Sequence, residues 1–253
     1  MDETEGPARA DESGVSVEVG PPGVPRRPLD QMRILRAAVD FIDVNGLGKL
    51  TMRRLGAHLG VEAMALYRYV PGREQLLDGV VEVVMDELYE STHAGGLSTS
   101  WQEYLQMQAH AVRTLAVTHP RIFPLVATRP PSAPWLRPPL RSLRWVESFL
   151  QGLREYGFSP RVSVAVYRSF ATFLLGALLF EAGTLEDLTI TEKVNLAFIE
   201  TDDLSSYPII SEMADELKDG GFEVEFEAAL EDLIERVAAM RTHRSADRES
   251  AFD

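Results

Sequence analysis

Apolar residues recur at helical spacing in two short runs between residues 51 and 70, with a glycine between the runs. Residues four apart lie on the same face of an α-helix, so each run can bury one face. The inward positions are Leu55, Leu59, Leu66 and Val70. Gly60 can supply the left-handed backbone that a sharp turn needs. The pattern predicts a helix-turn-helix whose second helix extends from about residue 62 to residue 70.

The borders of this motif, and a helix before it, can also be predicted. Thr51 stands where an N-cap belongs, and Pro71 with Gly72 stops the second helix. A broad apolar stripe from about Leu29 to Asn45 predicts a preceding helix that can cover the other two. Together they form a three-helix unit. A plain helical hairpin within a bundle would give a similar pattern.

Charge favours the first interpretation. Residues 26–75 carry nine basic and five acidic side chains, a net charge of +4. The whole chain has a net charge of −14, so the remaining residues sum to −18. A basic island in an acidic protein is the electrostatic footprint of phosphate binding. We therefore expect this segment to bind double-stranded DNA, with the acidic remainder held away from it.

The motif also resembles a known family. The stretch LTMRRLGAHLGVEAMALYRYV, followed by PGREQLLDGV, is similar to the DNA-binding domain of the tetracycline-repressor (TetR) family over about residues 29 to 90. The Thr-x-Arg opening, the Leu-Gly-Val turn and the Leu-Tyr-x-Tyr-Val core fall in register. The resemblance implies an all-helical homodimer. It further implies a repressor that binds a palindromic operator and leaves it when a small-molecule inducer binds the C-terminal domain.

The resemblance points to particular DNA contacts. The DNA-binding residues it suggests are Thr51, Arg53, Ala63, Met64, Ala65, Tyr67, Tyr69 and Arg73. Ala63, Met64 and Ala65 open the recognition helix and can only meet thymine methyl groups or fill the groove by shape. Arg53 is therefore expected to supply most of the hydrogen-bonded base readout, with a phosphate anchor as the alternative.

Three further residues are expected to contact the DNA backbone. Tyr67 and Tyr69 fall where the family places aromatic or His side chains on the backbone. Core packing is the alternative for both tyrosines. Arg73 begins the next helix, where its charge and the helix dipole could bind a phosphate.

The rest of the chain is also predicted to be helical, which makes the fold class all-α. Helices are expected near residues 73–90, 101–118, 121–127, 138–156, 160–183, 209–217 and 222–240. The segment 186–206 is acidic and weakly periodic, as a mobile connection or lid would be. The expected domains are a disordered acidic tail (1–25), a DNA-binding domain (26–75), a ligand-binding and dimerisation domain (76–242) and a frayed tail (243–253).

The helix at residues 160–183 is apolar on almost every side, which raises the question of a membrane span. Its uninterrupted apolar run, Phe170 to Phe180, has only 11 residues. A bilayer needs about 20. We therefore expect no membrane partner, and a central core helix that can also take part in a dimer interface.

The last helix carries apolar residues at coiled-coil spacing. They are Phe226, Leu230, Leu233, Val237 and Met240. This spacing suits one arm of a four-helix bundle. Doubled by a two-fold axis, this helix and the 160–183 helix would form the dimer interface. Packing within one chain is the alternative.

An apolar cavity between helices of the C-terminal domain would hold the small-molecule effector. The candidate lining residues are Trp101, Tyr104, His110, Arg113, Phe123, Trp135, Trp145, Phe149, Tyr167, Phe170 and Phe173. His110 and Arg113 could orient a polar ligand, although each candidate could equally be a structural residue. His119 could help to bind a ligand or simply end a helix before Pro120. We predict no cofactor and no metal, and do not assign tetracycline or magnesium.

Enzymatic function is disfavoured by what the sequence lacks. None of the five histidines forms a His-Glu-x-x-His pair, and there is no Gly-x-Ser-x-Gly elbow or phosphate loop. The absence of cysteine fits a reducing compartment, and the N-terminus has no apolar signal core. We expect a cytoplasmic, nucleoid-associated regulator that is not an enzyme. The alternatives are a constitutive DNA-binding regulator without a ligand and, further off, a helical small-molecule enzyme.

Overall fold

The computed structural model describes residues 28–94, 98–129, 142–191, 206–218 and 221–249, and all regular structure within these ranges is helical. The all-α fold class is thereby confirmed. The N-terminal part comprises α1 (Gln31–Asn45), the 3-10 helix η1 (Leu47–Lys49), α2 (Met52–Leu59) and α3 (Ala63–Leu66). The larger part comprises α4 (Arg73–Ala94), α5 (Trp101–Thr118), α6 (Phe123–Thr128), α7 (Leu143–Glu155), α8 (Pro160–Thr191), α9 (Pro208–Glu212), α10 (Ala214–Lys218) and α11 (Phe222–Glu249).

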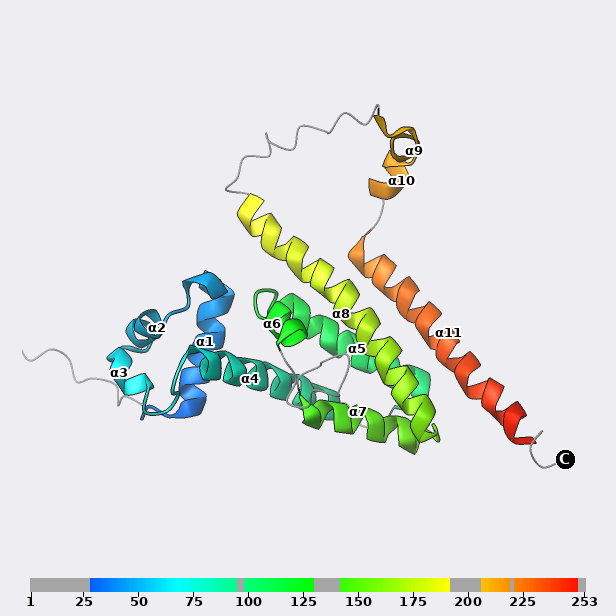
Figure 1. Ribbon diagram of the computed structural model, residues 1–253, viewed down its shortest axis with the longest axis horizontal. Helices are drawn as coiled ribbons and strands as arrows, with labels where there is room; N and C mark the ends of the chain where they lie inside the picture. The colour runs from blue at the N-terminus through cyan, green and yellow to red at the C-terminus, as the bar shows by residue number, and fades with distance from the viewer. Residues whose placement is uncertain (1–27, 95–97, 130–141, 192–205, 219–220, 250–253) are drawn as a thin grey trace, which may run out of the picture.

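Residues 28–72 form a small unit, hereafter the reading head, at one end of the long helix α4 (Figure 1). Helix α1 begins at Gln31 because the Asp30 carboxylate caps it, accepting a hydrogen bond from the Arg33 backbone N–H at 2.8 Å. Its apolar stripe packs against α2, as the pattern predicts, and also against α4, which the pattern did not predict. The core of the reading head consists of fully buried side chains that include Ile34, Ile42, Leu55, Leu66 and Val70.

The second helix of the motif is shorter than expected. Regular α-helix ends at Leu66, and the chain continues as a turn in which the N–H groups of Tyr69 and Val70 donate to the Leu66 carbonyl. Pro71 prevents the helix from continuing past Val70, because a proline disfavours helical backbone in the residue before it and provides no N–H. The turn still keeps Val70 buried.

Helix α8 is the centre of the larger body. It packs against α5, α6, α7 and α11. Residues 160–184 would pass as a membrane span by length and by their mean hydropathy of 1.7, but half of their most apolar stretch is buried inside the molecule. Helix α8 therefore provides the packed core that the other helices surround, as expected of an all-round apolar helix in a globular domain.

The apolar stripe of α11 packs within the chain. Phe226, Leu230, Leu233 and Val237 are buried against α5 and α8, so the alternative of intrachain packing holds for these residues. The two long helices α8 and α11 lie side by side (Figure 1). The α11 backbone stays helical to Glu249, past the point at which a frayed tail was expected to begin.

Other boundaries differ in detail. Helix α8 continues to Thr191, so the start of the expected lid is helical, while residues 192–205 lie outside the described residues. The single helix expected over 209–217 is two short helices, α9 and α10, which meet at Met213. Helix α7 begins at Leu143 because the Ser142 hydroxyl caps it. The expected start of this helix, near residue 138, and the acidic tail 1–25 lie outside the described residues.

Candidate nucleic-acid interface and effector cavity

Two glycines shape the helix-turn-helix, one by its backbone conformation and the other by its lack of a side chain. Gly60 adopts the left-handed conformation (φ 70°, ψ 33°) that the turn requires, as the sequence predicts. Gly56 allows the turn to approach α2 closely. A Cβ atom there would lie 2.9 Å from the Val61 carbonyl oxygen and 3.2 Å from the Ala63 nitrogen. Both helices of the motif are thus held at a short separation by backbone contact.

The recognition helix presents its apolar and aromatic side chains to solvent. Met64 is 77% exposed, which is unusual for methionine in a folded domain, and Ala63 and Ala65 are half-buried beside it. Tyr67 and Tyr69 are 43% and 38% exposed, so neither is a core residue. An exposed face of this composition, rimmed by basic side chains, indicates an interaction surface.

The basic and polar candidates lie around this face. Arg53 and Arg73 are exposed at the starts of α2 and α4. The Thr51 hydroxyl caps α2 by accepting a hydrogen bond from the Arg54 N–H at 3.2 Å, which confirms the predicted N-cap. The Arg73 guanidinium lies 3.5 Å from the Leu47 carbonyl oxygen, a long contact that leaves it near the motif. The reading head therefore combines an apolar recognition helix with flanking cations.

A cavity of about 340 Å³, hereafter the main cavity, lies between α4, α5 and α7. Its wall mixes aromatic, thioether and polar side chains from Thr92, His93, Ser98, Tyr104, Met107, Gln108, Ser148, Gln151, Gly152, Glu155 and Tyr156. Its volume lies within the range of small-molecule sites. Of the lining residues suggested by the sequence, the main cavity contains Tyr104.

Hydrogen bonds fix the wall of the main cavity at several points. The Tyr104 hydroxyl donates to the carbonyl oxygens of Ser148 and Phe149, both at 3.3 Å. Burial raises the pKa of Tyr104 well above its ordinary value, so its hydroxyl remains a donor at neutral pH. The Tyr156 hydroxyl donates to the Ser98 carbonyl at 2.7 Å. These tyrosines are thus rigid parts of the wall.

Gln108 is the polar group in this wall that remains unsatisfied. The residue is only 3% exposed, and its Oε1 atom has no hydrogen-bond partner among the described residues. A buried amide oxygen without a donor costs free energy, so such a group usually awaits a ligand or a water molecule. Sequence reasoning missed Gln108. A polar residue on the buried face of α5, in line with Leu105 and Val112, was the available signal.

A second cavity of about 250 Å³ lies between α4 and α5 on the side of the reading head. We call it the head-side cavity. It shares Thr92 and Met107 with the main cavity, so the two adjoin. Its other lining residues are Glu87, Leu88, Ser91, Ala111, Thr114, Leu115, Thr118 and His119. His119, which the sequence suggested as either a ligand contact or a helix terminator, ends α5 and also lines this cavity.

Most aromatic candidates pack against one another instead. Trp145, Phe149 and Phe170 stack in series, with ring centroids 5.2 and 5.0 Å apart. The remaining buried candidates are Trp101, Phe123 and Tyr167, and Trp101 packs edge-on against Phe158. None of these six lines the main or the head-side cavity. Trp145, Phe149, Tyr167 and Phe170 form core because α7 and α8 bury their apolar faces together. Trp135 lies outside the described residues.

The two charged candidates are bound to partners within the chain. The His110 ring lies 2.9 Å from the Glu227 carboxylate of α11. Arg113 forms hydrogen bonds to Glu181 of α8 and lies 3.7 Å from Glu223 of α11. The hydrogen bond to Glu181 raises the pKa of Arg113 above its ordinary value. These pairs join α5 to α8 and α11, which accounts for both residues without a ligand.

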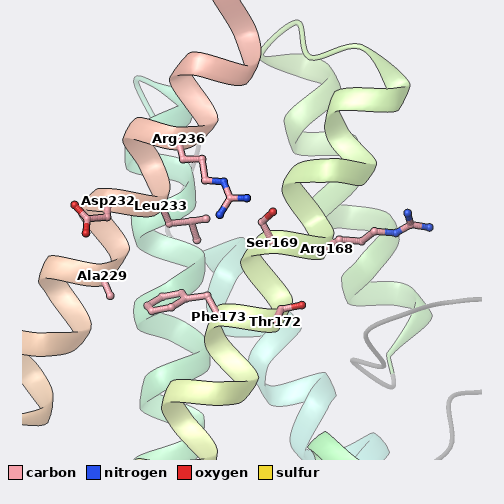
Figure 2. Close-up of a pocket in the computed structure, with 8 residues that line it drawn as sticks. All are labelled: Arg168, Ser169, Thr172, Phe173, Ala229, Asp232, Leu233 and Arg236. Atoms are coloured by element: carbon pink, nitrogen blue, oxygen red, sulfur yellow. The ribbon is translucent and has the colours of Figure 1, made fainter.

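A groove of about 560 Å³ separates α8 from α11. Phe173 of α8 and Leu233 and Arg236 of α11 point into it, whereas Arg168 and Asp232 point away (Figure 2). Phe173, suggested as a ligand residue, stacks on Phe226 at 5.4 Å and lines this groove. Among the described residues, no group of three or more His, Asp or Glu side chains is arranged to hold a metal ion.

A helix-turn-helix with exposed cations, joined through a long helix to a helical body with cavities, defines the class of DNA-binding regulators that carry a separate ligand-binding domain. Comparison with known families agrees. Residues 34–80 match the model of bacterial regulatory proteins of the tetR family, and residues 94–241 match the tetracyclin repressor-like C-terminal domain. The chain belongs to the TetR family, as its motifs predict. It is a transcriptional regulator and not an enzyme.

Individual relatives give the same result. The chain is 29% identical over 153 residues to the HTH-type transcriptional repressor DrrR1 of Streptomyces coeruleorubidus, covering 60% of this chain but only 54% of that repressor. It is 27% identical over 209 residues to the class A tetracycline repressor protein of Escherichia coli, covering 82% and 90%. A possible TetR family regulator from Streptomyces coelicolor A3(2) superimposes with a TM-score of 0.65 at 26% identity, covering 83% and 100%.

Proposed function

We propose that this protein is a nucleoid-associated repressor that binds a palindromic operator as a homodimer and is released by a small-molecule inducer. The observation that carries this proposal is the solvent-exposed recognition face of the reading head, mounted on a body that contains adjoining cavities. The charge of the reading head supports it, because residues 26–75 carry a net charge of +4 in a chain whose total is −14.

In this proposal the recognition helix enters the major groove. Met64, with Ala63 and Ala65 beside it, meets thymine methyl groups, and Arg53 reads a base by hydrogen bonds. Tyr67, Tyr69, Arg73 and Thr51 contact the DNA backbone at the edges of the groove. Their exposure around one face supports these roles.

Dimerisation would use the outer surface of α8 and the groove between α8 and α11. Val164 is 40% exposed and Phe180 is 68% exposed on this surface, although α8 is the central apolar helix. Gly176 and Gly183 are open to solvent on the same helix. Small residues beside exposed apolar ones allow a second helix to approach closely. A two-fold arrangement would place two reading heads on successive major grooves, about 34–36 Å apart.

The effector would occupy the main cavity and extend into the head-side cavity. Tyr104 and Tyr156 offer aromatic surface and Met107 a flexible thioether, while Gln108 offers an amide whose oxygen lacks a donor. This chemistry suits a planar ring compound that carries hydroxyl or amine donors. The unsatisfied Gln108 oxygen favours a ligand-responsive regulator over a constitutive one.

A direct test begins by selecting the preferred duplex from a random library with the purified protein. The complex with that duplex is then challenged with a library of hydroxylated ring compounds. We expect at least one compound to release the wild-type protein and to fail with Gln108→Leu, which removes the unsatisfied amide. Gln102→Leu, an exposed change on the same helix, should respond as the wild type does. If the protein selects no duplex, the proposal is refuted. If it binds a duplex and no compound releases it, the constitutive alternative is favoured.

A further inference from the structure

His119 occupies a fixed corner between α5 and α6. Its backbone N–H donates to the Leu115 carbonyl at 2.9 Å. Its own carbonyl accepts hydrogen bonds from the N–H groups of Ile122 and Phe123 at 3.0 and 2.9 Å. Ile122 and Phe123 are fully buried in the core of the larger body. The imidazole is therefore presented from a rigid part of that body.

The imidazole contacts two carboxylates from two other helices. Its Nδ1 atom lies 2.7 Å from Oδ2 of Asp43 in α1, which belongs to the reading head. Its Nε2 atom lies 3.6 Å from Oε2 of Glu87 in α4. Because both ring nitrogens face a carboxylate, the doubly protonated ring fits both contacts and the neutral ring can donate to only one. The side chain is only 14% exposed.

Arg121 adds a second cationic contact between the larger body and the end of α1. The Arg121 Nη1 atom donates to the carbonyl oxygens of Asp43 and Val44 at 2.7 and 2.8 Å, at the C-terminal end of α1. Cations are favourable there, because the carbonyl groups at a helix end carry partial negative charge. The charged groups around His119 are thus Asp43 from α1, Glu87 from α4 and Arg121 from its own connection.

The other edge of His119 belongs to a cavity. His119 and Glu87 both line the head-side cavity, together with Thr118 and Leu115. One side chain therefore contacts the reading head on one side and the space proposed for the effector on the other. A molecule in this cavity that engages Glu87 or displaces the imidazole would disturb the contact with Asp43.

We propose that His119 is the coupling residue through which the effector domain holds the reading head, and that neutralising or displacing its ring releases Asp43. This inference rests on the proposed ligand-responsive function. The hydrogen bond to Asp43 raises the pKa of His119 above its ordinary value of 6.5, and Glu87 acts in the same direction. A raised pKa means that the link is complete below pH 6.5 and is lost as the pH rises through the folded-state value.

One test needs no DNA. The ring proton on Cε1 of His119 is followed by NMR across the neutral pH range in the full-length protein. We expect a titration midpoint above 6.5 in the wild type and a lower midpoint in Asp43→Asn. The matched control is Glu227→Gln, which removes a carboxylate that pairs with His110 and should leave the His119 midpoint unchanged. A His119 midpoint unchanged by Asp43→Asn would overturn the link.

The second test measures coupling to DNA binding. The Kd for the selected duplex is measured from about pH 6 to pH 8.5 at constant salt, and should change by about threefold or more in the wild type. We expect His119→Gln to remove this pH dependence and the matched variant His110→Gln to retain it. A slope that survives in His119→Gln overturns the coupling alone. A wild type that binds no selected duplex refutes the proposed function, and with it the coupling.

A third test examines the head-side cavity without a ligand. Ala111→Phe places a ring in the head-side cavity and should weaken the pH dependence as His119→Gln does. Ser91→Phe serves the same purpose from α4 if Ala111→Phe does not fold. A wild-type pH profile in the folded variant would show that filling the cavity does not reach His119.

Discussion

Arg113 of α5 and Glu181 of α8 form a two-pronged ion pair, in which Nη2 and Nε donate to the two carboxylate oxygens at 2.9 and 3.2 Å. The Glu181 side chain is only 9% exposed and the Arg113 side chain 20% exposed. The geometry is the bidentate arrangement that makes arginine–carboxylate pairs strong. Together with Glu223 it joins three helices of the larger body. Arg113 is therefore already occupied in this structure, although its position had suggested a ligand contact.

Removing one partner of this pair should destabilise the fold. Arg113→Met leaves a largely buried carboxylate without its cation, and we expect the free energy of unfolding to fall by about 2–3 kcal/mol. Urea denaturation at neutral pH measures the loss. The double variant Arg113→Met with Glu181→Leu should recover most of it, because apolar replacement of both partners is often neutral. If the single variant unfolds like the wild type, the pair contributes nothing.

The close approach at Gly56 predicts a local steric effect. In Gly56→Ala the new methyl group would meet the Val61 carbonyl at 2.9 Å, so the turn must move away from α2. We expect a loss of about 1–3 kcal/mol in stability and weaker DNA binding. Gly48→Ala is the matched control, since its methyl group would meet nothing within 4 Å. Thermal unfolding of both variants decides the matter, and equal melting temperatures would contradict the close contact.

A substitution at Gly176 tests dimerisation without disturbing the fold of the single chain. A Cβ atom added at this position would meet no side chain or neighbouring helix within 4 Å, so Gly176→Arg should fold. If the outer face of α8 is a subunit interface, the arginine will force the subunits apart. Analytical ultracentrifugation should then find mass 28.2 kDa for the variant and twice that mass for the wild type. Glu90→Arg, an exposed change on α4, should remain dimeric. A dimeric Gly176→Arg protein would move the interface elsewhere.

Arg53 should determine sequence preference rather than general affinity. Arg53→Ala is expected to relax selectivity at one base pair in each half-site, worth about 1–3 kcal/mol of discrimination. Repeating the duplex selection with the variant shows whether the base preference is lost at one position of the selected sequences. Arg36→Ala removes the same charge from an exposed site on α1 and should leave the base preference unchanged at every position. Uniform weakening across all sequences would make Arg53 a phosphate anchor.

The sequence predicted the elements whose neighbours are local. The helix-turn-helix, its Thr51 cap and the left-handed Gly60 depend on residues within a few positions of each other, and so does the helix Trp101–Thr118, which was predicted at its observed ends. The same local rules correctly predicted that α8 is the central helix of a globular body.

The residues that line the main cavity could not be predicted from residue type alone. Aromatic side chains such as Trp145 and Phe149 look alike in sequence whether they stack in the core or line a space, and only the approach of α7 to α8 decides between them. Polar wall residues such as Gln108 and Ser148 come from different helices, so no single stretch of sequence shows that they face the same space. The pairing of His119 with Asp43, 76 positions apart, depends in the same way on how the reading head docks.

The stoichiometry of the DNA complex tests the central claim most directly. Sedimentation of the protein with its selected duplex at low salt should give one complex that contains two chains per duplex, with two half-sites about 10 base pairs apart. Dilution into high salt should dissociate it, since binding rests on phosphate contacts. A protein that sediments as a single 28.2 kDa chain and binds no duplex at low salt would contradict the account.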